Sequence, residues 1–284
     1  TISGLPAGEY AWDVRAVSTT RYTVAFNQYM PFSVVLDYTE LSGTLLASNT
    51  LALEISPYVI TGDIMIPSGS TVSIGPGAVL GFSEDCSMIC QGNLYVEGSP
   101  GDSVVFCANM ENEPWGGIMF TGGEADFAYT VFEGSDGFST GNQYRACIES
   151  DKADLMFESC LFRNNHGCLH LSEGSVYMNN CDLTGWNSAE LFFMNEGESA
   201  TIQNSSFGNM INPPSSHHDG VEFQNCSTGE YLVKNCEVFN IDGDAFDSNS
   251  SSLILEGNRI WNITDKGFSI GIGAAGTQIS DVIL

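Results

Sequence analysis

Carboxylates at a repeated spacing are the side chains of this sequence best suited to chemistry. Asp219 and Glu222 are three residues apart, and Asp244 and Asp247 repeat that spacing one segment later. Carboxylates stacked about 5 Å apart repel one another, and Ca²⁺, a hard cation that prefers oxygen ligands, is the natural ion to hold them. The pattern predicts a calcium site at these four residues, with Lys266 as an alternative, internal counter-ion for Asp244.

A ten-residue repeat positions these acids. From about residue 125 the pattern apolar, x, apolar, x, x, small, x, apolar, x, Asn/Gly occurs six times, starting at Ala125, Leu155, Val176, Ala200, Tyr231 and Leu253. Spacings of 21 to 31 residues correspond to one coil of a solenoid, in which equivalent residues of successive coils stack. We therefore predict an all-β chain folded as a right-handed parallel β-helix. One internal column should contain Cys160, Cys181 and Cys236, and one turn an asparagine ladder: Asn164, Asn209, Asn240 and Asn262.

A second column should carry the ligand-binding groove. Each repeat is followed by a small residue, then an apolar one, then a polar one; the small residues are Cys147, Cys168, Ser188, Gly220, Ala245 and Gly267. Strand side chains alternate in direction, so the polar column must face outward: Glu149, His170, Glu190, Glu222, Asp247 and Ser269. Asn187, Asp219, Asp244 and Lys266 precede this column. Insertions at Gly134–Gln143 and Asn212–His218 are expected to wall a groove over its first five members.

Two segments resemble known β-helix proteins. Strands and Gly/Pro turns between residues 41 and 120, such as Gly62–Ile66 and Gly92–Gly98, look like the opening coils of secreted right-handed parallel β-helices. Residues 242–273 resemble a segment of secreted bacterial β-helix proteins of the pectate-lyase-like superfamily. The resemblance implies an extracellular or cell-surface setting and names no reaction.

Catalysis is an alternative use of the acidic column. The resemblance to β-helix enzymes implies either Ca²⁺-assisted β-elimination with a Lys or Arg base, or hydrolysis by paired carboxylates, with Asp244, Asp247 and Lys266 as candidates. Residues 243–271 are loosely similar to polygalacturonase sites but lack their paired acid, Gly-His-Gly and Arg-x-Lys elements. The remaining interpretation is a solvated polar face with a weak surface ion pair. His217 and His218 are expected in an exposed loop rather than a metal site, because adjacent side chains usually point apart.

The first 35 residues resemble the end of a different domain. Leu5 and Tyr10 have the spacing of a fibronectin type III tyrosine corner, followed by alternating Trp12, Val14 and Ala16. We therefore expect a partial β-sandwich over residues 1–35 and the β-helix over 36–284, with opening coils at 36–124 and regular coils at 125–284 that continue beyond the sequence. Cys86 and Cys90 are the best disulfide candidates among the nine cysteines.

Composition excludes several function classes. With 35 Asp and Glu against 8 Lys and Arg, the formal charge of −27 repels nucleic acids and anionic membranes. No apolar run approaches the roughly 18 residues of a membrane span, and an apolar content of 43% excludes disorder.

The leading functional prediction is a non-catalytic extracellular module of a larger surface protein, structural, adhesive or glycan-facing. Its partners would be glycans, neighbouring domains, or further copies of itself in a filament, sheath or surface layer. The alternative is a polysaccharide lyase or glycoside hydrolase acting in the acidic groove.

Overall fold

The computed structural model describes residues 8–12, 15–17, 22–24, 30–34, 38–45, 49–52, 55–110, 113–138, 145–184, 190–209, 218–227, 229–274 and 276–284. The chain divides into two compact units, Thr1–Tyr38 and Thr39–Leu284. In the first, β1 (Gly8–Trp12) pairs antiparallel with β4 (Met30–Val34), and β2 (Arg15–Val17) with β3 (Tyr22–Val24). The fibronectin type III assignment stays a prediction for this unit.

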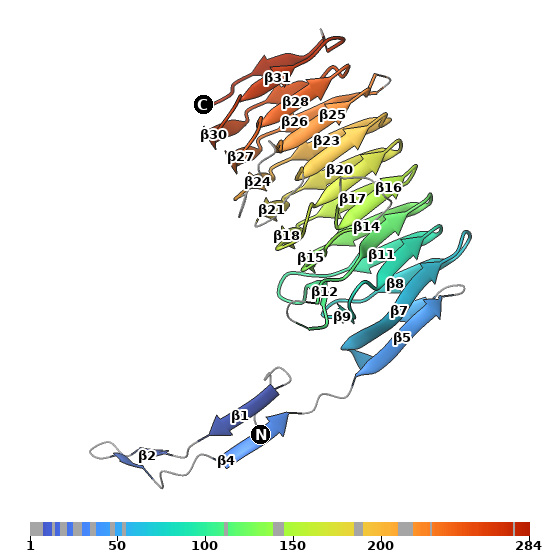
Figure 1. The fold of residues 1–284 in the computed structure, drawn as a ribbon, viewed down its shortest axis with the longest axis vertical. Coiled ribbons are helices and arrows are strands. Elements are labelled where there is room, and N and C mark those ends of the chain that lie inside the picture. Colours follow the sequence, from blue (N-terminus) through green and yellow to red (C-terminus); the bar gives the residue numbers. More distant parts are fainter. Residues whose placement is uncertain are drawn as a thin grey trace. The chain divides into compact units, whose positions relative to one another are not determined.

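The second unit is a parallel β-helix whose strands stack coil on coil (Figure 1). Face 1 consists of β10 (Ser87–Cys90), β13 (Gly117–Phe120), β16 (Ile148–Asp151), β19 (Leu169–Ser172), β22 (Phe192–Asn195), β25 (Val221–Gln224), β28 (Phe246–Asn249) and β31 (Phe268–Ile270). Face 2 consists of β6 (Asn49–Leu51), β8 (Thr71–Ile74), β11 (Asn93–Glu97), β14 (Glu124–Ala128), β17 (Asp154–Glu158), β20 (Ser175–Asn179), β23 (Ser199–Gln203), β26 (Tyr231–Lys234), β29 (Ile254–Glu256) and β32 (Gln278–Ser280).

Face 3 consists of β9 (Val79–Phe82), β12 (Val104–Ala108), β15 (Thr130–Glu133), β18 (Leu161–Arg163), β21 (Asp182–Thr184), β24 (Ser206–Gly208), β27 (Glu237–Ile241) and β30 (Arg259–Ile263). At the start of the solenoid, β5 (Thr39–Thr44) pairs with β7 (Tyr58–Ile66), which in turn pairs with both β9 and β10. None of the described residues forms a helix long and apolar enough to cross a membrane.

The repeat found in the sequence is the stacking unit of faces 2 and 3. Ala125 pairs with Leu155, Leu155 with Val176, Val176 with Ala200 and Ala200 with Tyr231, as the spacing predicts. The small-residue column is buried and hydrogen-bonded across coils, because the backbone N–H of Cys181 donates to Ser205 Oγ (3.0 Å) and that of Cys236 to Asn258 Oδ1 (2.8 Å). Short polar and thiol side chains therefore satisfy backbone groups inside the core.

All nine cysteines are free thiols. The predicted Cys86–Cys90 disulfide is wrong: Cys90 belongs to β10 and its side chain is fully buried in the core, whereas Cys86 precedes the strand and is half-buried. The spacing of the two cysteines could not show that the side chain of Cys90 points into the core, because side chains of a strand alternate between the core and the outside.

An asparagine ladder closes the turn that follows face 3. Asn240 Nδ2 donates to Asn209 Oδ1 and Asn262 Nδ2 to Asn240 Oδ1, each at 2.6 Å, and all three residues have positive φ. The ladder is confirmed for these three, whereas Asn164 donates to Glu133 Oε1 (3.2 Å). Asparagine suits the position because its short amide tolerates the left-handed conformation and pairs with its neighbour.

Replacing Asn240 with alanine is expected to lower the free energy of unfolding by about 1–2 kcal/mol, because two amide hydrogen bonds are lost and alanine is strained at positive φ. Asn240→Gly is the matched control, since glycine removes the ladder without the strain and should cost less. Urea unfolding of both variants measures the difference. Equal losses would show that the ladder, and not the backbone conformation, sets the requirement for asparagine.

Candidate functional site

The outward column of face 1 combines acidic, imidazole and aromatic side chains. Its register runs Met119, Glu149, His170, Phe193, Glu222, Asp247 and Ser269. The sequence-based prediction of Glu190 in this column is wrong, because Phe193 pairs with both His170 and Glu222. The predicted alignment placed small residues, Ser188 and Ala189, at positions that Leu191 and Phe192 fill; Asn187, Ser188 and Ala189 lie outside the described residues.

Glu190 instead belongs to a second column at the edge where the chain enters face 1. This edge column contains Glu190, Asp219, Asp244 and Lys266, each of which lies two residues before the first residue of its face 1 strand. Asp219 Oδ1 accepts a hydrogen bond from the backbone N–H of Asp244 (2.7 Å), and Asp244 Oδ1 accepts one from that of Lys266 (2.9 Å). Two of the predicted calcium ligands therefore bind the backbone of the following coil, a role that residue type and spacing did not reveal.

Lys266 supplies the positive charge for this edge. Its Nζ lies 3.3 Å from both oxygens of Asp244 and 2.7 Å from Asp265 Oδ2. Asp244 is 7% exposed, and its carboxylate accepts hydrogen bonds from the backbone N–H and the ammonium group of Lys266 in the next coil. The predicted alternative of Lys266 as the counter-ion of Asp244 is thus confirmed, and Asp247 lies apart from this pair in the outward column of face 1.

Two carboxylates of the outward column are covered rather than solvated. Glu149 and Glu222 are 5% and 8% exposed. Burial raises the pKa of Glu222 to about 7 and that of Asp219 to about 6, and it also raises the pKa of Asp247. Gln224 Nε2 donates to Glu222 Oε1 (2.6 Å), and Asn249 Nδ2 donates to Asp247 Oδ2 (2.8 Å). Near neutral pH the site therefore holds a partly protonated carboxyl at Glu222.

Two histidines complete the cluster. The ring of His170 meets that of Phe193 edge to face, with centroids 4.8 Å apart, and burial lowers the pKa of His170. His218 Nδ1 lies 3.5 Å from Glu190 Oε1. His217 and most of both predicted groove walls, residues 139–143 and 212–217, lie outside the described residues.

Calcium binding by Asp219, Glu222, Asp244 and Asp247 stays a prediction. Within the described part of the chain, no group of three or more His, Cys, Asp or Glu is arranged to hold a metal ion. Calcium bound only to the folded state must raise its stability, by about 2.7 kcal/mol when calcium is at a hundred times the dissociation constant. A melting temperature that rises with Ca²⁺ and falls with EDTA would support the site, provided Asp247→Asn abolishes the difference. The same melting temperature in both buffers would reject it.

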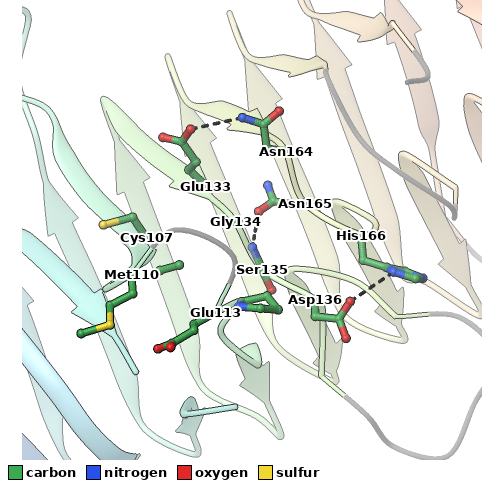
Figure 2. A pocket seen from close by; sticks show the side chains of 12 residues that line it. Cys107, Met110, Glu113, Glu133, Gly134, Ser135, Asp136, Asn164, Asn165 and His166 are labelled. Carbon is green, nitrogen blue, oxygen red and sulfur yellow. Dashed lines mark hydrogen bonds and ion pairs between the residues drawn. The ribbon is translucent and has the colours of Figure 1, made fainter. Parts of the chain in front are cut away.

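A cleft of about 720 Å³ opens farther along the same edge (Figure 2). It lies between the ends of β12 and β15 and the turn after β18, and its polar lining includes Glu113, Glu133, Asp136, Asn164 and His166. Burial raises the pKa of Cys107 to about 11, so this thiol stays protonated at neutral pH and is a poor nucleophile. The sequence signalled this cleft only through the insertion that begins at Gly134.

Ion pairs occupy two of the three carboxylates that line the cleft, Glu133 and Asp136. Arg145 Nη1 lies 2.5 Å from Asp136 Oδ2, and Arg163 Nη2 lies 2.8 Å from Glu133 Oε2. Asp136 also lies 3.5 Å from His166 Nδ1 (Figure 2). The cleft is therefore close to neutral, in contrast to the rest of the surface.

Comparisons with known proteins agree on the fold. A family model described as the right handed beta helix region matches residues 146–283. The crystal structure of the periplasmic alginate epimerase AlgG is similar with a TM-score of 0.51 and 13% identity, over 81% of this chain and 67% of that chain. No curated protein matches the sequence. The predicted fold is confirmed: the solenoid unit of this chain is a right-handed parallel β-helix.

Proposed function

We propose that this chain is a non-catalytic surface module, working outside the cytoplasm, that binds a polysaccharide along face 1. The observation that carries the proposal is the outward column around Phe193, where one aromatic ring stands between an imidazole and a carboxyl group in adjacent coils. An aromatic surface bordered by hydrogen-bonding groups suits a sugar ring, which has apolar C–H faces and a polar rim of hydroxyls. Strands stacked about 4.8 Å apart continue the column over several coils, so an extended chain could lie along it.

The structural neighbour supports the proposal of a polysaccharide ligand and of a location outside the cytoplasm. That neighbour is a periplasmic alginate epimerase. At 13% identity that likeness argues for the fold, and the rest is our extension to this chain.

Affinity electrophoresis of the full chain in gels containing soluble polysaccharides tests the proposal. We expect at least one polysaccharide to retard the protein, and Phe193→Ala to weaken that retardation about tenfold by removing the stacking surface. Tyr177→Ala is the matched control, because Tyr177 is an outward aromatic residue on β20 of face 2. Equal loss in both variants, or no retardation by any polysaccharide, would reject binding at face 1.

A second candidate is an enzyme that cleaves or modifies the bound glycan. It is favoured by Glu222 and Asp247, which pair in adjacent coils and whose pKa values are both raised by burial. Adjacent strands are about 4.8 Å apart, close to the roughly 5–5.5 Å between the carboxyl groups of retaining glycoside hydrolases. New reducing or unsaturated ends appearing in a retarding polysaccharide, and lost in both Glu222→Gln and Asp247→Asn, would establish catalysis. Unchanged chain length would leave the binding function alone.

A further inference from the structure

Every lysine and arginine of the solenoid forms an ion pair with an aspartate or a glutamate. Residues 39–284 contain six of them, all described, and each forms an ion pair: Arg145–Asp136, Lys152–Glu173, Arg163–Glu133, Lys234–Glu256, Arg259–Glu237 and Lys266–Asp244. All other charged side chains of this unit, apart from its histidines, are acids. The positive charges of these lysines and arginines are therefore neutralised by acids of the same chain, and the remaining acids leave the surface strongly negative.

Replacing the acidic partner in one of these ion pairs with a ligand carboxylate would bring no net gain in electrostatic energy. If a uronate took Arg145 from Asp136, or Arg163 from Glu133, the released carboxylate would lie beside the new one without its counter-ion. Both arginines pair with carboxylates that line the cleft of Figure 2, and a free arginine fork there would suit a ligand carboxylate. Like charges this close repel, and the chain's overall charge adds to the cost.

Face 1 poses the same obstacle. Lys266, in the edge column, is shared between Asp244 and Asp265, and His218 faces Glu190. The column itself presents the half-buried Asp247 beside Glu222, of which 8% is exposed, with the amides of Gln224 and Asn249. Carboxylates are hydrogen-bond acceptors, so they pair well with sugar hydroxyls and ammonium groups and badly with another carboxylate.

We infer that the polysaccharide bound along face 1 carries no acidic groups: it is a neutral or amine-bearing glycan, unlike the alginate named for the structural neighbour. This inference rests on the proposed function and narrows it to a class of ligand.

Affinity electrophoresis in EDTA with three probes tests the inference: a neutral β-glucan, a soluble fully deacetylated poly-glucosamine and a polyuronate. We expect retardation by the glucan or the poly-glucosamine and none by the polyuronate. The poly-glucosamine should weaken with added salt and the glucan should not, because only the former binds through charge. Retardation by the polyuronate would overturn the inference and leave glycan binding intact. No retardation by any probe would overturn the proposed function itself.

A gain-of-binding variant tests the physical cause. Combining Glu133→Gln with Asp136→Asn releases Arg163 and Arg145 from their partners at the cleft, and we expect polyuronate to retard this variant at low salt although it does not retard the parent. Glu173→Gln combined with Glu256→Gln is the matched control, because it releases Lys152 and Lys234 with the same change in net charge. No gain in the first variant, or an equal gain in both, would show that occupied arginines are not what excludes acidic glycans.

Discussion

Replacing Phe132 with alanine is expected to lower the free energy of unfolding by about 3–5 kcal/mol, one of the largest effects available in this fold. Phe132 is fully buried in β15, at the centre of a stack of aromatic rings. Its ring is stacked with those of Phe106 (5.3 Å) and Phe162 (4.5 Å) in the adjacent coils, and meets Phe127 edge to face (5.2 Å). Truncation leaves a cavity that three neighbouring rings cannot fill, because each is held by its own coil.

Urea unfolding measures this loss against Val131→Ala, a variant of the neighbouring residue on the same strand. Val131 is half-buried and points away from the core, so its truncation should cost less than about 1 kcal/mol. Losses of similar size in the two variants would show that the aromatic stack does not hold the coils together.

Stability is expected to fall as the pH rises from about 4 to 8, and Glu222 should cause much of the decline. Burial raises the pKa of Glu222 from 4.5 to about 7 in the folded state. A group with a raised folded pKa contributes stability that is complete below its unfolded pKa and is lost as the pH rises through the folded pKa. Asp219, whose pKa is raised to about 6, acts in the same direction over a lower range.

Glu222→Gln cannot ionise, so the variant should be more stable than the parent at pH 8, by on the order of 2–3 kcal/mol, and similar to it at pH 4. Urea unfolding at several pH values gives both curves. Glu256→Gln is the control, because Glu256 pairs with Lys234 at the surface and its loss should matter by less than about 1 kcal/mol. A parallel offset between the curves of the parent and Glu222→Gln would contradict a titrating Glu222.

The same titration bears on function. At neutral pH the Glu222 carboxyl is shared between a form that donates a hydrogen bond and one that only accepts. Glycan binding should therefore change with pH between 6 and 8 if Glu222 contacts the sugar.

Coil-by-coil alignment was within reach of the sequence in most coils, and it held even across the insertions that precede Glu149 and Glu222. Leu155, Val176 and Ala200 pair as their shared pattern predicts, and Asn240 and Asn262 form the predicted ladder. The alignment failed in one coil. In that coil the small residues Ser188 and Ala189 led to a predicted register three positions too early. Glu190 was therefore predicted in the outward column of face 1, at the position that Phe193 occupies. Turn length is free to vary in a solenoid, so local pattern does not always fix the register after an irregular turn.

The sequence by itself determined the fold of the solenoid, because stacking identical coils demands a repeat of apolar, small and asparagine residues that is written in the chain. It also determined that acids gather near one face. Only the tertiary structure decided which acids serve the backbone, since Asp219 and Asp244 are capped by N–H groups of coils that lie far along the chain. It likewise decided that all six solenoid cations are already paired, because an ion pair depends on which side chains the stacking brings within a few ångströms.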